Sequence, residues 1–544
     1  MSMSDQAAQD TADLERFGYK QELKRGLGTF SSFAVAFAYI SPSTGIFTLF
    51  FLGMAAAGAY LFWTWPIVAL MQFVVAMNFA ELSSHFPVAG SVYQWTKYLA
   101  GRGYAWFTGW FYVIAGILTV ASVVATLPLA LFPMLNTMFD WNLTADFSGG
   151  GQPDQAIAGL ITLALITILN IYGVKIVAIV NNTGVFFEIL GMVVFAIFLA
   201  IAHDNSGLGV IFDSGATGNF AEFPAPITLP FFLVAMFMSL YVIYGFDTAG
   251  TLAEEMHNPK REAPKAVLAA VAGAFVIGAV FLWGILVAVP DMGEAVTGFF
   301  SPPVILGQVL SEALFVLYLF VVVASIFICC LAVQTSTIRL AFGMARDNQL
   351  PFSRTMSKVS PRLHTPVATC VIIGLLAAIP FIQFAGAGLI AIGATASIYL
   401  SYLLGNLAFM RARMRGWPKT KAPFSLGVWG KVVNIVAILW GVAMLANFLT
   451  PSGAVSGLDP GSASPASYLR INTNPKPVQT DYFVEGEQLL DFKIGFLNEI
   501  PIIWTVFGVV SIVGAIYYLA VQRRKPVDVV VLPDTEVAET APAT

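Results

Sequence analysis

The length of its uncharged apolar runs constrains this chain more than any other feature. The run from Ile227 to Tyr244, for example, contains no charged residue. About 20 apolar residues in a helix cross the roughly 30 Å hydrocarbon core of a bilayer. Only 11% of the 544 residues are charged and 58% are apolar, whereas a soluble domain carries about 25% charged residues. Because helices satisfy their backbone hydrogen bonds within lipid, the sequence predicts an all-α integral membrane protein.

Twelve such runs are long enough to span a membrane, so we expect about twelve transmembrane helices. Two neighbouring pairs, around Gly173 and Gly386, are separated by very short turns. The predicted spans are 30–56, 60–80, 104–134, 156–174, 176–202, 228–253, 266–290, 309–338, 367–385, 387–410, 431–450 and 501–521.

The basic residues test this arrangement, because short loops rich in Lys and Arg stay on the cytoplasmic side. With the N-terminus inside, the predicted inner segments contain all but three of the 27 Lys and Arg residues. The exceptions, Arg470, Lys476 and Lys493, fall in one long outer loop. We therefore expect a multi-pass protein of the cytoplasmic (plasma) membrane with both termini in the cytoplasm. The basic residues indicate membrane orientation rather than binding of nucleic acid.

The spans divide the chain into segments. The first 25 residues are polar and contain no signal-peptide core. Residues 85–101 are too polar to span, but their helical spacing of apolar residues predicts a short amphipathic helix on the inner membrane face. The predicted segments are a cytoplasmic N-terminal segment 1–27, a five-helix repeat 28–202, an outer loop 203–227, a second five-helix repeat 228–410, helices 11 and 12 in 411–522 with a long outer loop 451–500, and a disordered cytoplasmic tail 523–544.

Two spans contain residues that interrupt a helix. Span 1 includes YISPSTGIF at 39–47 and span 6 includes YGFDTAG at 244–250. Because these breaks lie five spans apart, they are typical of a 5+5 inverted-repeat transporter, in which broken helices 1 and 6 form a binding site near the midplane. Freed N–H groups at the start of a half-helix attract a carboxylate, and freed carbonyls attract an ammonium group.

Several motifs in this order resemble the amino acid-polyamine-organocation (APC) superfamily of transporters, which share the LeuT-like fold. They are SPSTGIF in span 1, ELSSHFPVAGSVYQW at 81–95, YGFDTAGTLAEEMHNPKREAPKAV at 244–267, RLAFGMARDNQLPFSR at 339–354 and TPV at 365–367. FAYISPSTGIF, the Asp in GFDTAG and APFSLGVWGKVVNIVAILW at 422–440 are most similar to the amino acid/choline branch, which includes 4-aminobutyrate (GABA) permeases.

The resemblance implies a substrate site at the two breaks. Backbone amides of 43–46 would bind a substrate carboxylate, carbonyls of Tyr244 and Gly245 would bind its amine, and Phe246 would close over it as an aromatic gate. The substrate-binding residues predicted in this way are Ser41, Ser43, Thr44, Gly45, Ile46, Tyr244, Gly245, Phe246, Asp247 and Thr248.

Two intramembrane carboxylates are functional candidates, because such groups are rare and costly in lipid. Asp247 has three open readings: it binds the substrate amine, carries a coupling proton, or caps the N–H groups where span 6 restarts at Thr248. Glu188 on span 5 is similar in position to a lysine of some proton-coupled relatives, and desolvation favours its neutral form, which suits proton uptake and release. A carboxylate there suits H⁺ or Na⁺, and a purely structural Glu facing Asn181 or span 1 is the alternative.

Charges at the inner membrane edge are candidate gating residues. We expect Glu81, Glu255 and Arg339 to form or break ion pairs as the inner side opens, and we interpret Arg346 and Asp347 as ordinary membrane-flanking charges. The four His residues are scattered, so no metal site is expected. No set of residues typical of an enzyme was found.

The predicted function is therefore a secondary active transporter that imports an amino acid or related organic amine by proton-linked alternating access. The alternatives are an exchanger and a substrate sensor that keeps the fold without transport. No cofactor is expected, H⁺ is the expected coupling ion with Na⁺ left open, and the expected partners are the small-molecule substrate and the lipid bilayer. The substrate itself and the oligomeric state are not predicted.

Overall fold

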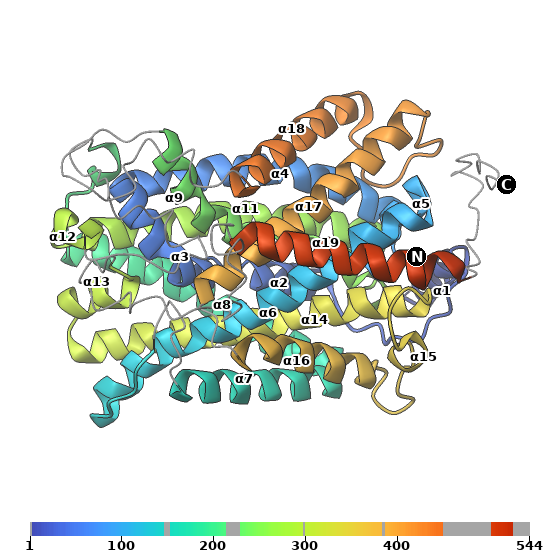
Figure 1. Ribbon diagram of the computed structural model, residues 1–544. Helices are drawn as coiled ribbons and strands as arrows, with labels where there is room; N and C mark the ends of the chain where they lie inside the picture. The colour runs from blue at the N-terminus through green and yellow to red at the C-terminus, as the bar shows by residue number, and fades with distance from the viewer. Residues whose placement is uncertain are drawn as a thin grey trace, which may run out of the picture.

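A computed structural model describes residues 3–145, 153–213, 229–297, 300–382, 387–449 and 502–525 (Figure 1). The predicted outer loop 451–500 and residues 526–544 of the predicted tail lie outside the described residues, as does 214–227 of the loop after span 5.

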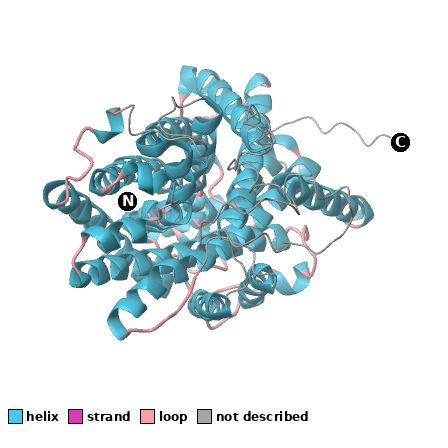
Figure 2. Ribbon diagram, turned by 60° about the vertical axis from the view of Figure 1, so that its left-hand side comes forward, coloured by secondary structure: helices cyan, strands magenta, loops and turns pink. Residues whose placement is uncertain are grey.

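Helices make up nearly all the regular structure of the described residues (Figure 2). Every predicted span has a helix, or a broken pair of helices, at its place in the chain. The α-helices are α1 (Met3–Glu15), α2 (Thr29–Ile40), α3 (Pro42–Ala57), α4 (Leu61–His85), α5 (Ser91–Ala100), α6 (Arg102–Phe139), α7 (Pro153–Tyr172), α8 (Val174–Ala202), α9 (Leu229–Val242), α10 (Thr248–Thr251), α11 (Pro259–Ala288), α12 (Met292–Thr297), α13 (Pro302–Val309), α14 (Glu312–Arg346), α15 (Ser353–Met356), α16 (Val367–Ile382), α17 (Ala387–Met414), α18 (Gly430–Leu449) and α19 (Ile502–Ala520). Short 3-10 turns at Gly58–Tyr60, Val210–Phe212, Ala253–Glu255, Gly427–Trp429 and Gln522–Arg524 complete them.

The long helices have the length and apolar character of membrane spans. Eight helical stretches of the described residues meet both criteria, and Phe232–Val242 and Val367–Pro380 are shorter apolar helices. Large apolar side chains are exposed on the outer helices, such as Ile179 and Ile201 on α8 and Leu439 on α18. Exposed apolar faces of this kind are stable in lipid and not in water. The prediction of an all-α, multi-pass membrane protein is confirmed.

Both predicted breaks are present. α2 ends at Ile40 and α3 begins at Pro42, with Ser41 between them in the left-handed region at φ 36°. α9 ends at Val242 and α10 begins at Thr248. Within the second break Gly245 has φ 80°, and a Cβ there would lie 1.9 Å from the Tyr39 ring. Only glycine fits, so the two breaks pack directly against each other.

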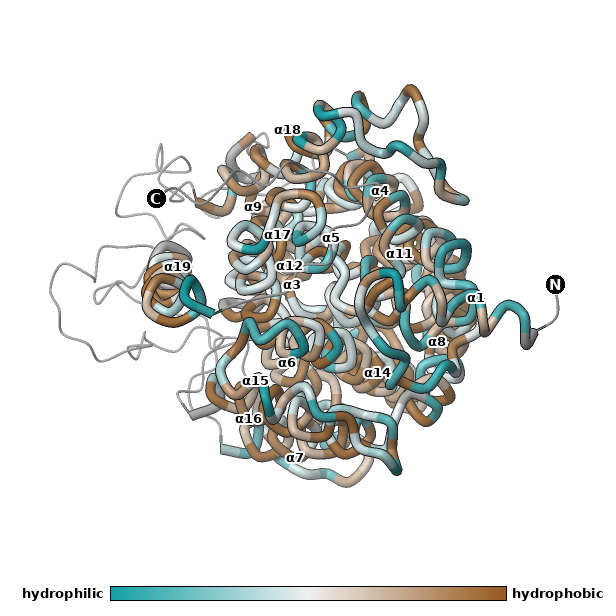
Figure 3. The backbone as a smooth tube through the Cα atoms, turned by 90° about the vertical axis from the view of Figure 1, so that its right-hand side faces the viewer, coloured by the Kyte–Doolittle hydropathy of each residue, from teal (hydrophilic) through white to brown (hydrophobic). Residues whose placement is uncertain are grey.

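The short helix expected at 85–101 is α5, and it is buried beneath other parts of the chain instead of being exposed. Its residues from Ser91 to Leu99 are buried, because the N-terminal segment and the connection after α17 cover it: Phe17 contacts Phe86 and Tyr98, and Trp417 stacks on Phe86. We call the end of the bundle that carries α1, α5 and α15 the α5 end; α12 and α13 lie at the opposite end (Figure 1). Figure 3 looks onto the α5 end, where hydrophilic stretches gather.

Candidate functional site

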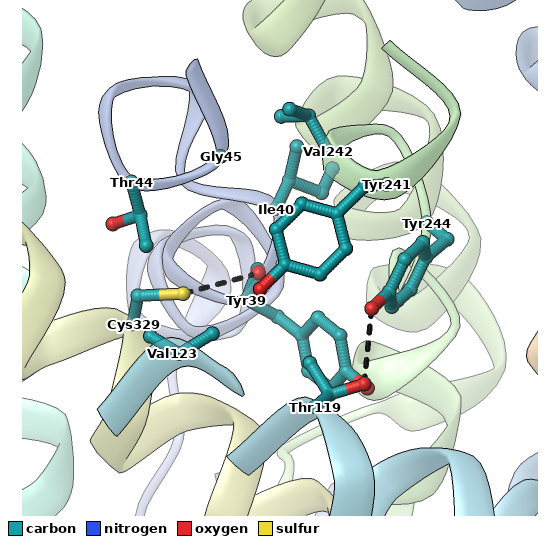
Figure 4. A pocket seen from close by; sticks show the side chains of 10 residues that line it. All are labelled: Tyr39, Ile40, Thr44, Gly45, Thr119, Val123, Tyr241, Val242, Tyr244 and Cys329. Atoms are coloured by element: carbon teal, nitrogen blue, oxygen red, sulfur yellow. Dashed lines mark hydrogen bonds between the residues drawn. The ribbon is translucent and has the colours of Figure 1, made fainter. Parts of the chain in front are cut away.

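A small pocket lies where the two broken helices meet (Figure 4). It is lined from both sides of the α2–α3 break, from the end of α9, and from α6 and α14. The lining residues are Tyr39, Ile40, Thr44, Gly45, Thr119, Val123, Tyr241, Val242, Tyr244 and Cys329. This is the place at which the matched breaks predicted a binding site.

Tyrosine rings fill most of the pocket. The centroids of Tyr39 and Tyr244 lie 6.0 Å apart and those of Tyr241 and Tyr244 5.9 Å apart, both pairs edge to face. The Tyr244 hydroxyl lies 2.9 Å from the Thr119 hydroxyl. The remaining space holds at most about one water molecule. An amino acid enters only if the rings move, so the structure is a closed conformation of the site.

The predicted substrate residues divide between this pocket and its surroundings. Thr44, Gly45 and Tyr244 line it, and the other predicted residues are not among its lining. Phe246, expected to be the aromatic gate, packs its ring 5.4 Å from that of Tyr402 and 6.0 Å from that of Phe79. The rings that face the pocket are instead those of Tyr39, Tyr241 and Tyr244 (Figure 4).

Sequence reasoning assigned no role to seven of the ten lining residues, namely Tyr39, Ile40, Thr119, Val123, Tyr241, Val242 and Cys329. A signal was present for two of them. Tyr39 directly precedes the SPSTG break, and Tyr241 lies one helical turn before Tyr244, on the same face. The residues of α6 and α14 carried no comparable signal.

Glu188 of α8 joins the site from behind the first break. Its Oε1 accepts hydrogen bonds from the Ser41 and Ser43 hydroxyls, both at 2.7 Å. The Ser41 hydroxyl also lies 2.6 Å from that of Thr44, which lines the pocket. Glu188 Oε2 is buried and has no hydrogen-bond partner among the described residues. Half of this carboxyl group therefore retains unused bonding capacity beside the break.

Asp247 lies in the second break and is fully hydrogen-bonded. The Ser91 hydroxyl donates to Oδ2 at 2.7 Å, the Tyr112 hydroxyl donates to both oxygens at 2.7 Å, and the Tyr402 hydroxyl donates to Oδ1. The Asp247 side chain makes no capping bond to α10, so the capping interpretation is wrong. Tyr402 also accepts the Gly245 N–H at 2.9 Å. The carboxylate thereby ties α5, α6 and α17 to the break.

A layer of ion pairs closes the α5 end below the pocket. The Arg339 Nε donates to Glu255 Oε1 at 2.7 Å, and both side chains are buried. Arg346 binds both oxygens of Glu254, at 2.7 and 3.1 Å, and the Ala89 N–H donates to the same carboxylate. Two predicted gating residues, Glu255 and Arg339, are thus partners of each other.

Arg346 and Asp347 are not ordinary membrane-flanking charges, contrary to expectation. Asp347 accepts hydrogen bonds from Lys97 and from the Tyr19 hydroxyl, each at 2.7 Å, and all three side chains are largely buried. The reason is that α5 and the N-terminal segment cover the end of α14. Glu81, the third predicted gating residue, pairs with Arg413 at the end of α17.

The N-terminal segment reinforces this layer. The Gln21 amide donates to the Glu254 carbonyl at 3.0 Å, and the Gly26 and Leu27 N–H groups donate to the Glu255 carbonyl at 2.9 and 3.0 Å. No group of three or more His, Cys, Asp or Glu side chains in the described part of the chain could hold a metal ion.

Comparison with known proteins identifies the family. The family model described as "Amino acid permease" matches residues 27–464. The chain belongs to the amino acid permease family. The permease is 26% identical to the amino-acid permease BAT1 of Arabidopsis thaliana, over 80% of this chain and 88% of the relative. It is 25% identical to the BAT1 homolog of Oryza sativa, over 81% and 87%, and 23% identical to the GABA-specific permease of Saccharomyces cerevisiae, over 68% and 66%.

The family confirms the resemblance to APC superfamily permeases that the motifs indicated. It also confirms that the permease is a transporter of amino acids and not an enzyme. The pocket at the two breaks and the ion pairs at the α5 end are therefore parts of a transport protein.

Proposed function

We propose that this permease is a secondary active transporter that imports an amino acid or a related organic amine across the cytoplasmic membrane, driven by protons. Glu188 is the coupling group. The observation that carries the proposal is the pair of 2.7 Å hydrogen bonds from Ser41 and Ser43 to Glu188 Oε1 at the first break.

The start of α3 is the place where a substrate carboxylate would bind. Pro42, the first residue of α3, has no N–H, and the amides of Ser43 and Thr44 have no partner in a preceding helical turn. Such amides attract an anion. An ionised Glu188 already accepts the hydroxyls of the same turn, and it would repel a second carboxylate in this dry environment.

Protonation of Glu188 removes that repulsion. The neutral acid can give up one serine hydroxyl or rotate away, so the substrate carboxylate and the proton bind together. Loss of the substrate to the cytoplasm then favours release of the proton. This linkage is what a symporter requires, because neither species crosses efficiently alone.

Alternating access requires the α5 end to open. The pairs Glu255–Arg339, Glu254–Arg346 and Glu81–Arg413 join different helices, so they must separate as the substrate leaves on that side. The positive-inside pattern supports a cytoplasmic location of this end and of both termini. The closed layer and the collapsed pocket together correspond to a conformation without access from the cytoplasm.

The relatives support the substrate class. They are named amino-acid permeases, and one is named a GABA-specific permease. An α-amino acid or GABA carries both the carboxylate and the ammonium group that the two breaks would bind. Exchange without net import, and sensing without transport, are the competing functions.

Uptake into liposomes tests the proposal. The purified permease is reconstituted, and labelled GABA, choline and a panel of α-amino acids are offered under an imposed pH gradient, with and without Na⁺. We expect accumulation driven by the pH gradient alone. Accumulation that requires a Na⁺ gradient would reassign the coupling ion, and binding without accumulation under any gradient would favour the sensor.

The variant Glu188→Gln isolates the coupling role. We expect it to lose accumulation and to retain exchange of internal for external substrate, because glutamine resembles the protonated acid. Glu312→Gln is the matched control, since Glu312 is an exposed carboxylate at the start of α14. Uphill uptake by Glu188→Gln would overturn the assignment of Glu188.

A further inference from the structure

The segment between the end of α17 and the start of α18 is strongly basic. Residues 411–431 contain six Lys and Arg and no Asp or Glu. Arg413 is the buried member and pairs with Glu81. The other five cations are exposed: Arg411, Arg415, Lys419, Lys421 and Lys431.

The same segment lies at the edge of a lipid-facing surface. Along α18 the residues Val432, Ile435, Leu439 and Val442 are exposed at spacings of three and four, which puts them on one helix face. Val428 and Trp429, directly before α18, are 90% and 68% exposed. An exposed tryptophan at the end of an apolar stripe is typical of the level of the lipid headgroups.

We infer that this basic segment is a binding site for anionic phospholipid headgroups. Lys431 follows Trp429 closely, so its ammonium group lies at the boundary at which the apolar stripe ends. Arg415 and Lys421 add positive charge without a carboxylate in the segment to neutralise it. Clusters of four to eight cations next to a membrane helix attract anionic lipid, by about a factor of five for each cation.

This lipid site is connected to the ion pairs of the α5 end. A Cβ on Gly430 would lie 2.0 Å from Arg413 Nη1, so the Arg413 guanidinium packs directly on the backbone next to Lys431. Trp417 of the same segment stacks on Phe86 and contacts the His85 ring at a centroid distance of 4.6 Å. A lipid that orders this segment therefore stabilises the Glu81–Arg413 pair and the closed α5 end.

Lipid retention measured by native mass spectrometry tests the site. The full-length permease is incorporated into nanodiscs of phosphatidylcholine with phosphatidylglycerol, extracted into mild detergent, and weighed with its bound lipids. We expect wild type to retain phosphatidylglycerol in preference to phosphatidylcholine. We expect the triple variant Arg415→Gln, Lys421→Gln, Lys431→Gln to lose that preference by about tenfold or more.

The matched control removes three exposed cations elsewhere at the same end. Arg354→Gln, Lys358→Gln, Arg362→Gln changes the connection between α14 and α16 and leaves 411–431 intact. The site is supported if this control still prefers phosphatidylglycerol over phosphatidylcholine. The charge-preserving variant Lys421→Arg, Lys431→Arg should keep the same preference. Equal loss in both triple variants would overturn it, because overall charge would then explain retention.

Two further results would also overturn the inference. One is equal retention of both lipids by wild type. The other is displacement of phosphatidylglycerol by inorganic phosphate at matched concentration, which would indicate a site for free phosphate. A thermal-shift series gives the second readout: phosphatidylglycerol should raise the unfolding temperature of wild type and the control but not of the basic-segment variant. None of these readouts requires transport, so their outcome is independent of the proposed symport.

Discussion

The two buried carboxylates beside the helix breaks are held in different ways. Asp247 accepts four hydrogen bonds from three side chains, which come from α5, α6 and α17. Glu188 accepts two side-chain hydrogen bonds, both at one oxygen and both from the first break, and its other oxygen has no partner among the described residues.

This difference supports a structural role for Asp247 and the proposed coupling role for Glu188. A buried acceptor with every position filled rigidifies the groups around it, and removing it leaves several donors unpaired. A carboxylate with one unpaired oxygen can take up a proton or change partners at a lower cost in free energy, because fewer hydrogen bonds are lost. Under the proposed function, Asp247 would fix the closed arrangement at the second break and Glu188 would exchange the coupling proton at the first.

The largest expected difference between Asp247 and Glu188 is the effect of replacing each carboxylate by leucine. Asp247→Leu leaves Ser91, Tyr112 and Tyr402 without their acceptor, at about 1–3 kcal/mol for each buried unpaired group. We expect little folded protein. Glu188→Leu leaves two serines that can pair locally, since Ser41 already contacts Thr44, and we expect a folded protein without proton-driven accumulation. Fluorescence-detected size exclusion measures the folded yield.

Asp247→Asn is the control for this pair. The amide keeps one acceptor oxygen, so we expect a folded protein with lowered transport. Equal yields of the two leucine variants would contradict the distinction between a structural and a working carboxylate.

Removing single donors sharpens the comparison at the second break. Tyr402→Phe removes a donor to Asp247 and also the acceptor of the Gly245 N–H, whereas Tyr112→Phe removes a donor alone. We expect Tyr402→Phe to lower the unfolding free energy by about 1–3 kcal/mol and Tyr112→Phe by about 1 kcal/mol. The double variant should be non-additive, because both tyrosines bond one carboxylate. Thermal unfolding of the two single variants and the double variant measures this; additive losses would argue against one shared network.

At the first break, the comparable donors should affect transport more than stability. Ser43→Ala removes one hydrogen bond to Glu188, and Ser41→Ala removes one to Glu188 and the contact with Thr44. Each variant leaves the other serine donor to Glu188 in place, and a tenfold change in KM corresponds to about 1.4 kcal/mol. We expect KM for uptake to change by about tenfold, more in Ser41→Ala than in Ser43→Ala, while the unfolding temperature changes little. Initial rates over a range of substrate concentrations give KM; an unfolding temperature as low as that of Tyr402→Phe would remove the distinction between the breaks.

Most of the fold could be predicted because lipid restricts the options. Uncharged runs of sufficient length form helices, and Pro42 with Ser41, or Gly245 with Asp247, cannot continue one. Both breaks and the short turn at Gly173 follow from such local rules.

The partners of the polar residues could not be predicted in the same way. Tyr112 and Tyr402 bond Asp247 from 135 and 155 residues away, and no local pattern identifies such pairs. Arg346 and Asp347 were misread for the same reason: their position in sequence is at a membrane edge, but α5 and the N-terminal segment cover them. The direction of the Phe246 side chain could not be predicted either, because it depends on how the backbone turns at Gly245.

The smallest predicted effect tests whether hydrogen bonds offset the desolvation of a buried charged group. Lys97, outside the membrane-spanning segments, is also buried and hydrogen-bonded, since it donates to Asp347 and to Tyr19. Burial nevertheless lowers the pKa of Lys97 below its ordinary value of 10.5, against the opposing effect of Asp347.

Between the lowered pKa of Lys97 and the ordinary value, the unfolded chain binds more protons than the folded protein. The free energy of unfolding should therefore rise with pH in this alkaline window. Burial and Asp347 raise the pKa of Tyr19, so its ionisation does not interfere below about pH 10. One proton contributes at most about 1.4 kcal/mol per pH unit, and Lys97→Met should flatten the rise measured by thermal unfolding in the alkaline range below pH 10.5. If stability depends on pH with the same slope in Lys97→Met as in wild type, the bonds of Lys97 to Asp347 and Tyr19 fully offset its desolvation. The number of hydrogen-bond partners would then be enough to distinguish a structural charged group from a functional one in this permease.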